Sequence, residues 1–200
     1  MNSGQKAPLA LTPEELRALL EATLAHNDRE AFVMFLIGVA HGLRVSELIE
    51  LRRRDFEETA TGIQLTVQRL KNSNKTTQEL LSAPNPLLDE LTVVREWIKD
   101  LKPNDRLFNL GDRFAVGRRF EKYAKLAGVS TQKRHIHVLK HTTGILLRKS
   151  GADIVVIQQV LGHRSVQSSM QYMRLTTEEV EEGRQRAFAM AAGVAMAAGA

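Results

Sequence analysis

Apolar side chains recur every three to four residues along most of this chain, a period that predicts helices. Between Ile63 and Gln68 apolar and polar residues instead alternate one by one, as in a β-strand. Residues 72–74 form a turn sequence, so residues 76–81 can return as a partner strand. The pattern predicts helices over 13–23, 29–40, 86–101, 112–126, 137–150, 152–161, 165–174 and 176–190. The predicted fold class is mainly α with a small antiparallel β-sheet (α+β).

Local signals place several boundaries of these elements. Thr12 is a suitable N-cap and is followed by Pro13 at the first helical position. Gly42 can end the strongly apolar helix over 29–40. Ser46 can cap a short turn that runs through Leu51.

The length and composition favour one domain with short additions. We expect residues 1–10 to be a flexible lead-in, residues 11–175 to form the domain, and residues 176–200 to be a C-terminal helix and tail. In that helix, Phe188 and Met190 are the expected packing anchors. The chain contains no cysteine, which excludes disulfides and a thiol nucleophile. No apolar run is long enough to span a bilayer, so we expect a cytoplasmic protein without membrane contact.

The charge is unevenly distributed. The whole chain has a formal charge of +5, and residues 1–175 alone carry +7 because four Glu and two Arg lie in residues 176–200. This excess favours a polyanionic partner such as nucleic acid.

Three separated strings contain groups that could act together on a phosphodiester. Arg44 follows a glycine at a predicted helix end, where its guanidinium could hold two phosphate oxygens. His137, Lys140 and His141 share one helical face through the spacing i, i+3, i+4. Tyr172 lies nine residues after His163, in a segment of polar side chains. A phenol has a pKa of about 10 and would need a base and nearby cations to act as a nucleophile.

Other interpretations remain open from the residues alone. Arg44 could simply form a surface ion pair with Glu47, and His163 could be only a helix cap. His135, His137 and His141 could instead bind zinc in a metal-dependent hydrolase, although the glutamate of a metalloprotease helix is missing.

Taken together, the strings resemble the catalytic domain of tyrosine recombinases, the lambda-integrase-like enzymes that break and rejoin DNA. The resemblance rests on His-Gly-Leu-Arg-Val-Ser-Glu-Leu over 41–48, His-Val-Leu-Lys-His over 137–141, and Leu-Gly-His over 161–163 followed by Tyr172. It implies the tyrosine recombinase catalytic-domain fold and a 3′-phosphotyrosyl intermediate formed without metal, ATP or other cofactor.

The resemblance also implies a role for each matching residue. Tyr172 would be the nucleophile and His137 would accept its proton. Arg44, Lys140 and His163 would stabilise the phosphorane. Lys71, on the predicted hairpin, would protonate the departing 5′-oxygen, with Lys75 as the alternative. Glu47 and His141 would support the site.

Lys140 departs from the family pattern, in which an arginine is expected at this position. Lysine keeps the charge but loses the planar fork of donors. An alternative is therefore a DNA-binding relative with weak or lost catalysis.

The expected partner is double-stranded DNA, bound by a monomer that forms a tetramer on paired sites. Because only about ten residues precede the first helix, the N-terminal core-binding domain of the family is expected to be absent. The expected DNA-contacting side chains are Arg52, Arg53, Arg54, Lys75, Lys133 and Arg134.

Overall fold

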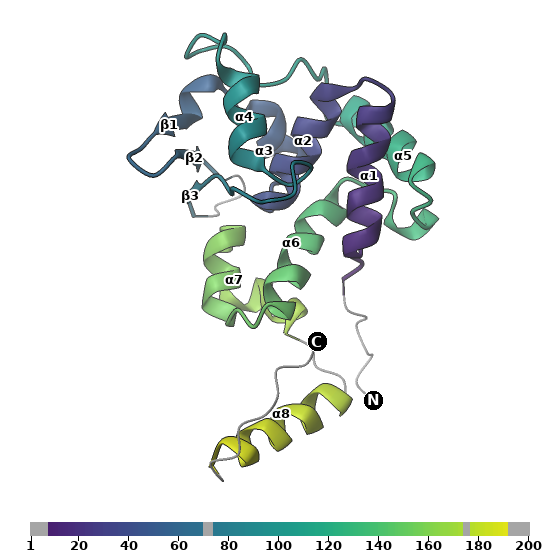
Figure 1. The fold of residues 1–200 in the computed structure, drawn as a ribbon, viewed down its shortest axis with the longest axis vertical. Coiled ribbons are helices and arrows are strands. Elements are labelled where there is room, and N and C mark those ends of the chain that lie inside the picture. The colour runs from purple at the N-terminus through teal and green to yellow at the C-terminus, as the bar shows by residue number, and fades with distance from the viewer. Residues whose placement is uncertain (1–7, 70–73, 174–176, 192–200) are drawn as a thin grey trace.

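The computed structural model describes residues 8–69, 74–173 and 177–191, which form a mainly helical body with a small sheet at one side (Figure 1). The α-helices are α1 (Pro13–Ala25), α2 (Arg29–Ala40), α3 (Val45–Glu50), α4 (Glu90–Ile98), α5 (Arg113–Leu126), α6 (His137–Lys149), α7 (Ile154–Leu161) and α8 (Thr177–Ala191). The strands are β1 (Phe56–Glu58), β2 (Ile63–Val67) and β3 (Thr76–Glu79). Short 3₁₀ turns are η1 (Arg53–Asp55), η2 (Thr131–Lys133), η3 (Val166–Ser168) and η4 (Met170–Tyr172). The predicted fold class is confirmed, and none of the described helices is long and apolar enough to cross a membrane.

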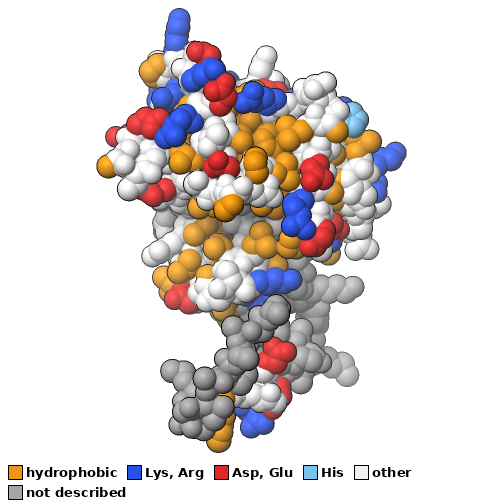
Figure 2. Space-filling model, viewed as in Figure 1, with side chains coloured by type: hydrophobic (Ala, Val, Ile, Leu, Met, Phe, Trp, Pro, Cys, Tyr) orange, Lys and Arg blue, Asp and Glu red, His pale blue; other side chains and the backbone are white. Residues whose placement is uncertain are grey.

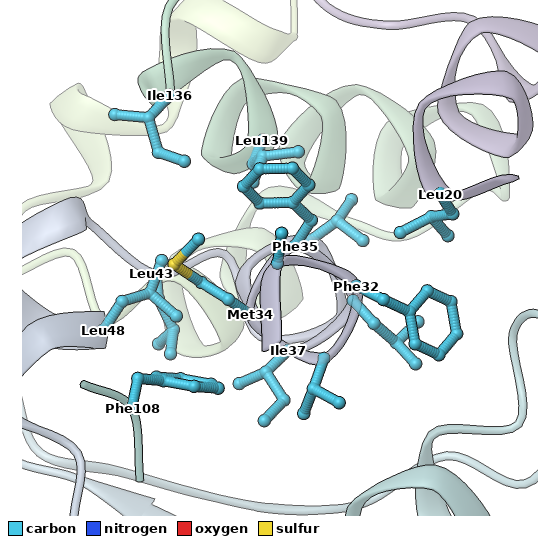
Figure 3. Close-up of a cluster of buried hydrophobic side chains, with 14 of the residues drawn as sticks. Leu20, Phe32, Met34, Phe35, Ile37, Leu43, Leu48, Phe108, Ile136 and Leu139 are labelled. Atoms are coloured by element: carbon cyan, nitrogen blue, oxygen red, sulfur yellow. The ribbon is translucent and has the colours of Figure 1, made fainter. Parts of the chain in front are cut away.

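Helix α2 forms the centre of the core. Every residue from Ala31 to Val39 is buried, as expected of a helix that is apolar on all sides. Its side chains point outward in all directions, toward Leu20 of α1, Phe108, and Leu139 of α6 (Figure 3). The predicted range of this helix is confirmed at both ends.

The sheet has the antiparallel order β1-β2-β3. Ile63, Leu65 and Val67 of β2 are buried while the residues between them are more exposed, which confirms the alternation read from the sequence. Strand β1 was not predicted, because three residues are too few to show a period. Val67 pairs with Thr76, so β2 and β3 flank residues 70–73. Lys71 lies in that segment, outside the described residues.

Three sequence predictions are corrected. The helix expected over 165–174 is two 3₁₀ turns, with Ser165 accepting from the Gln167 amide. The helix expected over 86–101 is the shorter α4, because turns occupy the residues around Pro84 and Pro86. The short turn after Gly42 begins with Val45, so Ser46 does not cap it.

Helix α6 links the main core to a second apolar cluster that contains Ile157, Leu161 and Tyr172. Helix α8 lies apart from this body (Figure 1). Phe188 is 77% exposed and does not pack on this body, so its role as a packing anchor stays a prediction. The side chain of Met190 and residues 1–7 of the expected lead-in lie outside the described part of the chain.

Candidate active site

The three strings converge on one pocket of about 290 Å³. Its lining residues are Arg44, His137, Lys140, His141, His163, Ser168, Gln171 and Tyr172. Five of the six predicted catalytic residues are therefore together, and the sixth, Lys71, lies outside the described residues. Ser168 and Gln171 were not predicted, because a serine and a glutamine in a polar segment carry no distinctive signal.

Arg44 is placed by the turn between α2 and α3. Gly42 has φ +57°, and a Cβ there would lie 2.4 Å from Cδ2 of Leu161, so both its conformation and its packing favour glycine. Glu47 accepts from the Arg44 backbone N–H at 2.8 Å and from its guanidinium at 2.7 Å. Burial alone would raise the pKa of Glu47, but the Arg44 amide and the Arg69 guanidinium hold it below its usual value. Glu47 is thus a buried carboxylate that fixes the position of Arg44.

Tyr172 is 1% exposed and lies between two histidine rings. Its Oη is 3.0 Å from His141 Nδ1, and its ring stacks on His163 with centroids 6.3 Å apart. Gly144 makes room for the ring, since a Cβ there would lie 2.6 Å from Cε1 of Tyr172. Burial raises the pKa of Tyr172 to about 12, although Arg44 opposes the shift. The phenol is therefore protonated at neutral pH.

The burial of Tyr172 corrects the picture of a tyrosine on a polar helix. The 3₁₀ turn η4 directs the ring inward against Ile157 and Leu161. The contact with His141 also gives that residue a more direct place than the supporting one expected. His137, the expected proton acceptor, lines the same pocket at the start of α6.

Both histidines beside the phenol are neutral near pH 7. Burial lowers the pKa of His141, and the positive fields of His135, His137 and Lys140 lower it further. Burial, followed by the charges of Lys140, Arg44 and Arg69, lowers the pKa of His163 to about 4. The Nδ1 atom of His163 is 2.9 Å from Ser169 Oγ. A neutral imidazole at 3.0 Å can accept the phenolic proton.

Lys140 is buried, with its ammonium directed at main-chain oxygens. Nζ donates to the carbonyls of Gly42 at 2.9 Å and Leu161 at 2.8 Å. Burial, then the positive charges of Arg69 and Arg44, lowers the pKa of Lys140 to about 7. The site therefore contains a lysine that changes charge near neutral pH.

Arg69 is a site residue that the sequence reasoning missed. It is buried beside Lys140 and Glu47, and its Nη1 lies 3.1 Å from Oε2 of Glu47. The only available signal was its position two residues before Lys71, which marks the hairpin and not the burial of the guanidinium.

Most of the side chains expected to contact DNA are engaged in local hydrogen bonds. Arg52 and Arg54 donate to the backbone and side chain of Asn104, and Arg53 donates to the Phe56 carbonyl. Lys133 forms an ion pair with Glu15, and Arg134 donates to the Val129 carbonyl, whereas Lys75 is exposed. Basic and acidic side chains are mixed on the face shown in Figure 2. Contact of these residues with DNA stays a prediction.

The zinc alternative depended on three histidines coming together. Within the described residues, no group of three His, Cys, Asp or Glu side chains is arranged to hold a metal ion.

Together with the sequence comparisons, the fold and the pocket define the class of the protein as a tyrosine recombinase catalytic domain. Residues 10–179 match the phage integrase family, and the chain belongs to that family.

Several relatives share its sequence. Type 1 fimbriae regulatory protein FimE of Escherichia coli strain K12 is 29% identical over 176 residues, which cover 81% of this chain and 83% of FimE. Tyrosine recombinase XerA of Pyrococcus furiosus is 31% identical over 189 residues, covering 90% of this chain but 62% of XerA.

Solved structures share the fold. The crystal structure of XerA recombinase superposes with a TM-score of 0.70 at 24% identity, covering 92% of this chain and 65% of that chain. XerH recombinase bound to a palindromic difH substrate superposes with a TM-score of 0.71 at 23% identity. The match covers 92% of this chain and 54% of the XerH chain. The chain thus spans less than two thirds of the length of XerA and about half of XerH.

Proposed function

We propose that this chain is a site-specific DNA recombinase catalytic domain that cleaves and rejoins DNA through a 3′-phosphotyrosyl intermediate. The observation that supports this most strongly is the hydrogen bond between the Tyr172 phenol and the neutral imidazole of His141. Arg44, Lys140 and His163 line the same pocket. These are a nucleophile, a proton acceptor and a set of phosphate-binding groups in one place. Its membership of the phage integrase family supports the same reaction.

In the cleavage step, Tyr172 Oη attacks the scissile phosphorus as its proton passes to His141 Nδ1. We assign the first proton transfer to His141 because of its 3.0 Å contact, and His137 remains the acceptor that the family resemblance implies. The bond from phosphorus to the 5′-oxygen breaks, and that oxygen takes a proton from an acid, for which Lys71 is the candidate. Arg44, Lys140 and His163 stabilise the charge on the phosphorane. Attack by another strand's 5′-hydroxyl reverses the step, so the phosphoester energy is retained.

The proposed partner is double-stranded DNA, and the proposed assembly is a tetramer on paired sites. XerH has been solved with a difH substrate before and after cleavage, and lambda integrase with a core site. The net positive charge of residues 1–175 suits the same partner.

A second candidate function is sequence-specific DNA binding with weak catalysis, and Lys140 is the observation that favours it. A neutral lysine cannot stabilise a phosphorane by charge, and the pKa of Lys140 is about 7.

Capture of a covalent adduct distinguishes the two functions. Duplexes with a randomised core and a nick beside each possible cleavage point are incubated with the protein in EDTA. Cleavage then releases a short fragment, which traps the tyrosyl-linked DNA for a denaturing gel and sequencing. We expect adducts with an enriched core sequence, and none from Tyr172→Phe, which loses only the phenolic oxygen.

Two results would contradict this proposal. Adducts from Tyr172→Phe would show that another residue is the nucleophile. Enriched binding without adduct from the wild type would favour the DNA-binding alternative.

A further inference from the structure

Helices α2 and α7 end close to each other. The carbonyl groups of His41 and Gly42, which follow α2, lie close to those of Val160 and Leu161 at the end of α7, because shared donors bind both pairs. Helix C-termini carry partial negative charge, so two of them meeting need cations between them. Each helix end also leads directly into a pocket residue, Arg44 after α2 and His163 after α7.

Arg69 fills the space between these helix ends. Its Nη2 donates to the carbonyls of His41 and Val160, at 2.8 and 2.9 Å. Its Nη1 donates to the Gly42 carbonyl at 3.2 Å and to Glu47 at 3.1 Å, and its Nε donates to Thr76 Oγ1 at 2.9 Å. These bonds use all five N–H groups of a guanidinium, which no other side chain could supply.

Lys140 also binds carbonyls at these helix ends. Its ammonium binds the same Gly42 carbonyl and the neighbouring Leu161 carbonyl. The two cations therefore cover the carbonyls at both helix ends, Lys140 from α6 and Arg69 from the base of the β2–β3 hairpin.

The base of the β2–β3 hairpin packs against Gly162, the glycine of the Leu-Gly-His string. Gly162 has φ +64°, and a Cβ there would lie 2.8 Å from Arg69 Cγ and 3.1 Å from the Asn74 carbonyl. The Asn74 N–H also donates to the Gly162 carbonyl at 3.2 Å. The glycine thus allows the side chain of Arg69 and the returning hairpin chain to pack directly on the end of α7.

We infer that Arg69 is a positioning residue that, together with Lys140, fixes Arg44, His163 and the hairpin base relative to one another. This inference rests on the proposed function. Arg69 is buried and does not line the pocket, so it acts through the residues it holds and not on the DNA.

Arg69→Lys tests the inference because lysine keeps the charge but has three N–H donors on a single nitrogen. The matched control is Arg119→Lys, which alters a partly buried arginine paired with Asp28 and Glu30, away from the pocket. We expect Arg69→Lys to slow adduct formation at saturating DNA about 100-fold per folded molecule, as a misplaced reacting group does. The DNA concentration for half-saturation should change less than threefold, and Arg119→Lys should leave both values at the wild-type level.

A second pair of variants covers the case in which Arg69→Lys does not fold. Thr76→Val removes only the oxygen that accepts from Arg69 Nε, whereas Thr76→Ser keeps it. We expect a slower rate for the valine variant, about tenfold, and recovery of the wild-type rate for the serine variant.

Hydrogen exchange on the DNA-free protein gives a readout that does not depend on cleavage. The amides of Asn74 and His163 donate to the Gly162 and Gln158 carbonyls. In Arg69→Lys their exchange should accelerate about tenfold, while amides inside α5 keep the wild-type rate.

Several outcomes would overturn the inference. They are unchanged exchange at Asn74 and His163, equal rates for Thr76→Val and Thr76→Ser, or the same loss of rate in the Arg119 control. If the wild type forms no adduct with any duplex, the proposed function fails, and the exchange measurement still decides whether Arg69 fixes these segments.

Discussion

The titration of Lys140 gives a quantitative prediction for the pH dependence of cleavage. The ammonium is the form that can stabilise a phosphorane, and its pKa in the free protein is lowered to about 7 by burial and then by Arg69 and Arg44. Raising the pH through 7 therefore removes the charge, so activity falls on the alkaline side. Lys140→Arg should abolish this fall, because a guanidinium stays charged throughout this range.

The size of the effect follows from the protonated fraction. With a pKa of about 7, roughly one molecule in eleven carries the charge at pH 8, and each further unit removes another factor of ten. The value of kcat/KM reports the free enzyme, so it should fall about tenfold from its plateau by pH 8. The alkaline fall in kcat should occur at a higher pH than the fall in kcat/KM, because the phosphate of bound DNA favours the charged ammonium form of Lys140.

The rate of single-turnover adduct formation between pH 6 and pH 9 measures this pH dependence. The substrate is the DNA core sequence that is enriched in the captured adducts. Lys149→Arg, an exposed change on the same helix, is the control and should reproduce the wild-type curve. Enlarging a buried side chain costs about 1–3 kcal/mol of stability, so the comparison uses the shape of each pH profile and not its maximal rate. If the rate of Lys140→Arg falls at the same alkaline pH as that of the wild type, Lys140 is not the group that titrates.

Two further variants test the packing and the buried polar network around the site. Gly144→Ala should slow adduct formation about 100-fold, because its Cβ would lie 2.6 Å from the Tyr172 ring and displace the phenol; thermal melting checks that the fold survives. Glu90→Gln should lower the free energy of unfolding by about 3–5 kcal/mol, because Glu90 is paired with buried His41 at 2.8 Å. Burial lowers the pKa of His41, but Glu90 raises it more, so the pKa in the folded protein lies above 6.5. The stability that the Glu90–His41 pair contributes is therefore complete below pH 6.5 and is lost as the pH rises through the pKa of His41 in the folded protein. Urea unfolding of both proteins should therefore show a stability difference that narrows above pH 6.5.

The elements that were predicted well are those with strong local signals. Helix α2 was predicted at both ends because it is one strongly apolar run of side chains that is followed by Gly42. Strand β2 was predicted because its alternation reflects one buried and one exposed face. Strand β1 and the 3₁₀ turns before Tyr172 were missed or misassigned, because three residues show no period and their form depends on tertiary packing.

Most of the residues that line the pocket were named from the sequence, but their environment was described less well. The strings around Arg44, Lys140 and His163 identified the pocket lining, since those side chains face the same space. The burial of Tyr172 could not be read from its polar neighbours, because a 3₁₀ turn sends adjacent side chains in different directions. The bond to His141 follows from that burial and was equally hidden.

Arg69 was beyond sequence reasoning for a different physical reason. Most of its acceptors are backbone carbonyls, which every residue has, so they leave no trace in the identity of the side chains. Three of them lie 27, 28 and 91 residues away along the chain. The same contacts change the meaning of Lys140, whose loss of the arginine fork seemed from the sequence to weaken phosphate binding. With Arg69 satisfying the His41 and Val160 carbonyls, a shorter ammonium suffices for the Gly42 and Leu161 carbonyls. The lysine is therefore one half of a two-cation arrangement, and substitutions at Arg69 and Lys140 should be strongly non-additive.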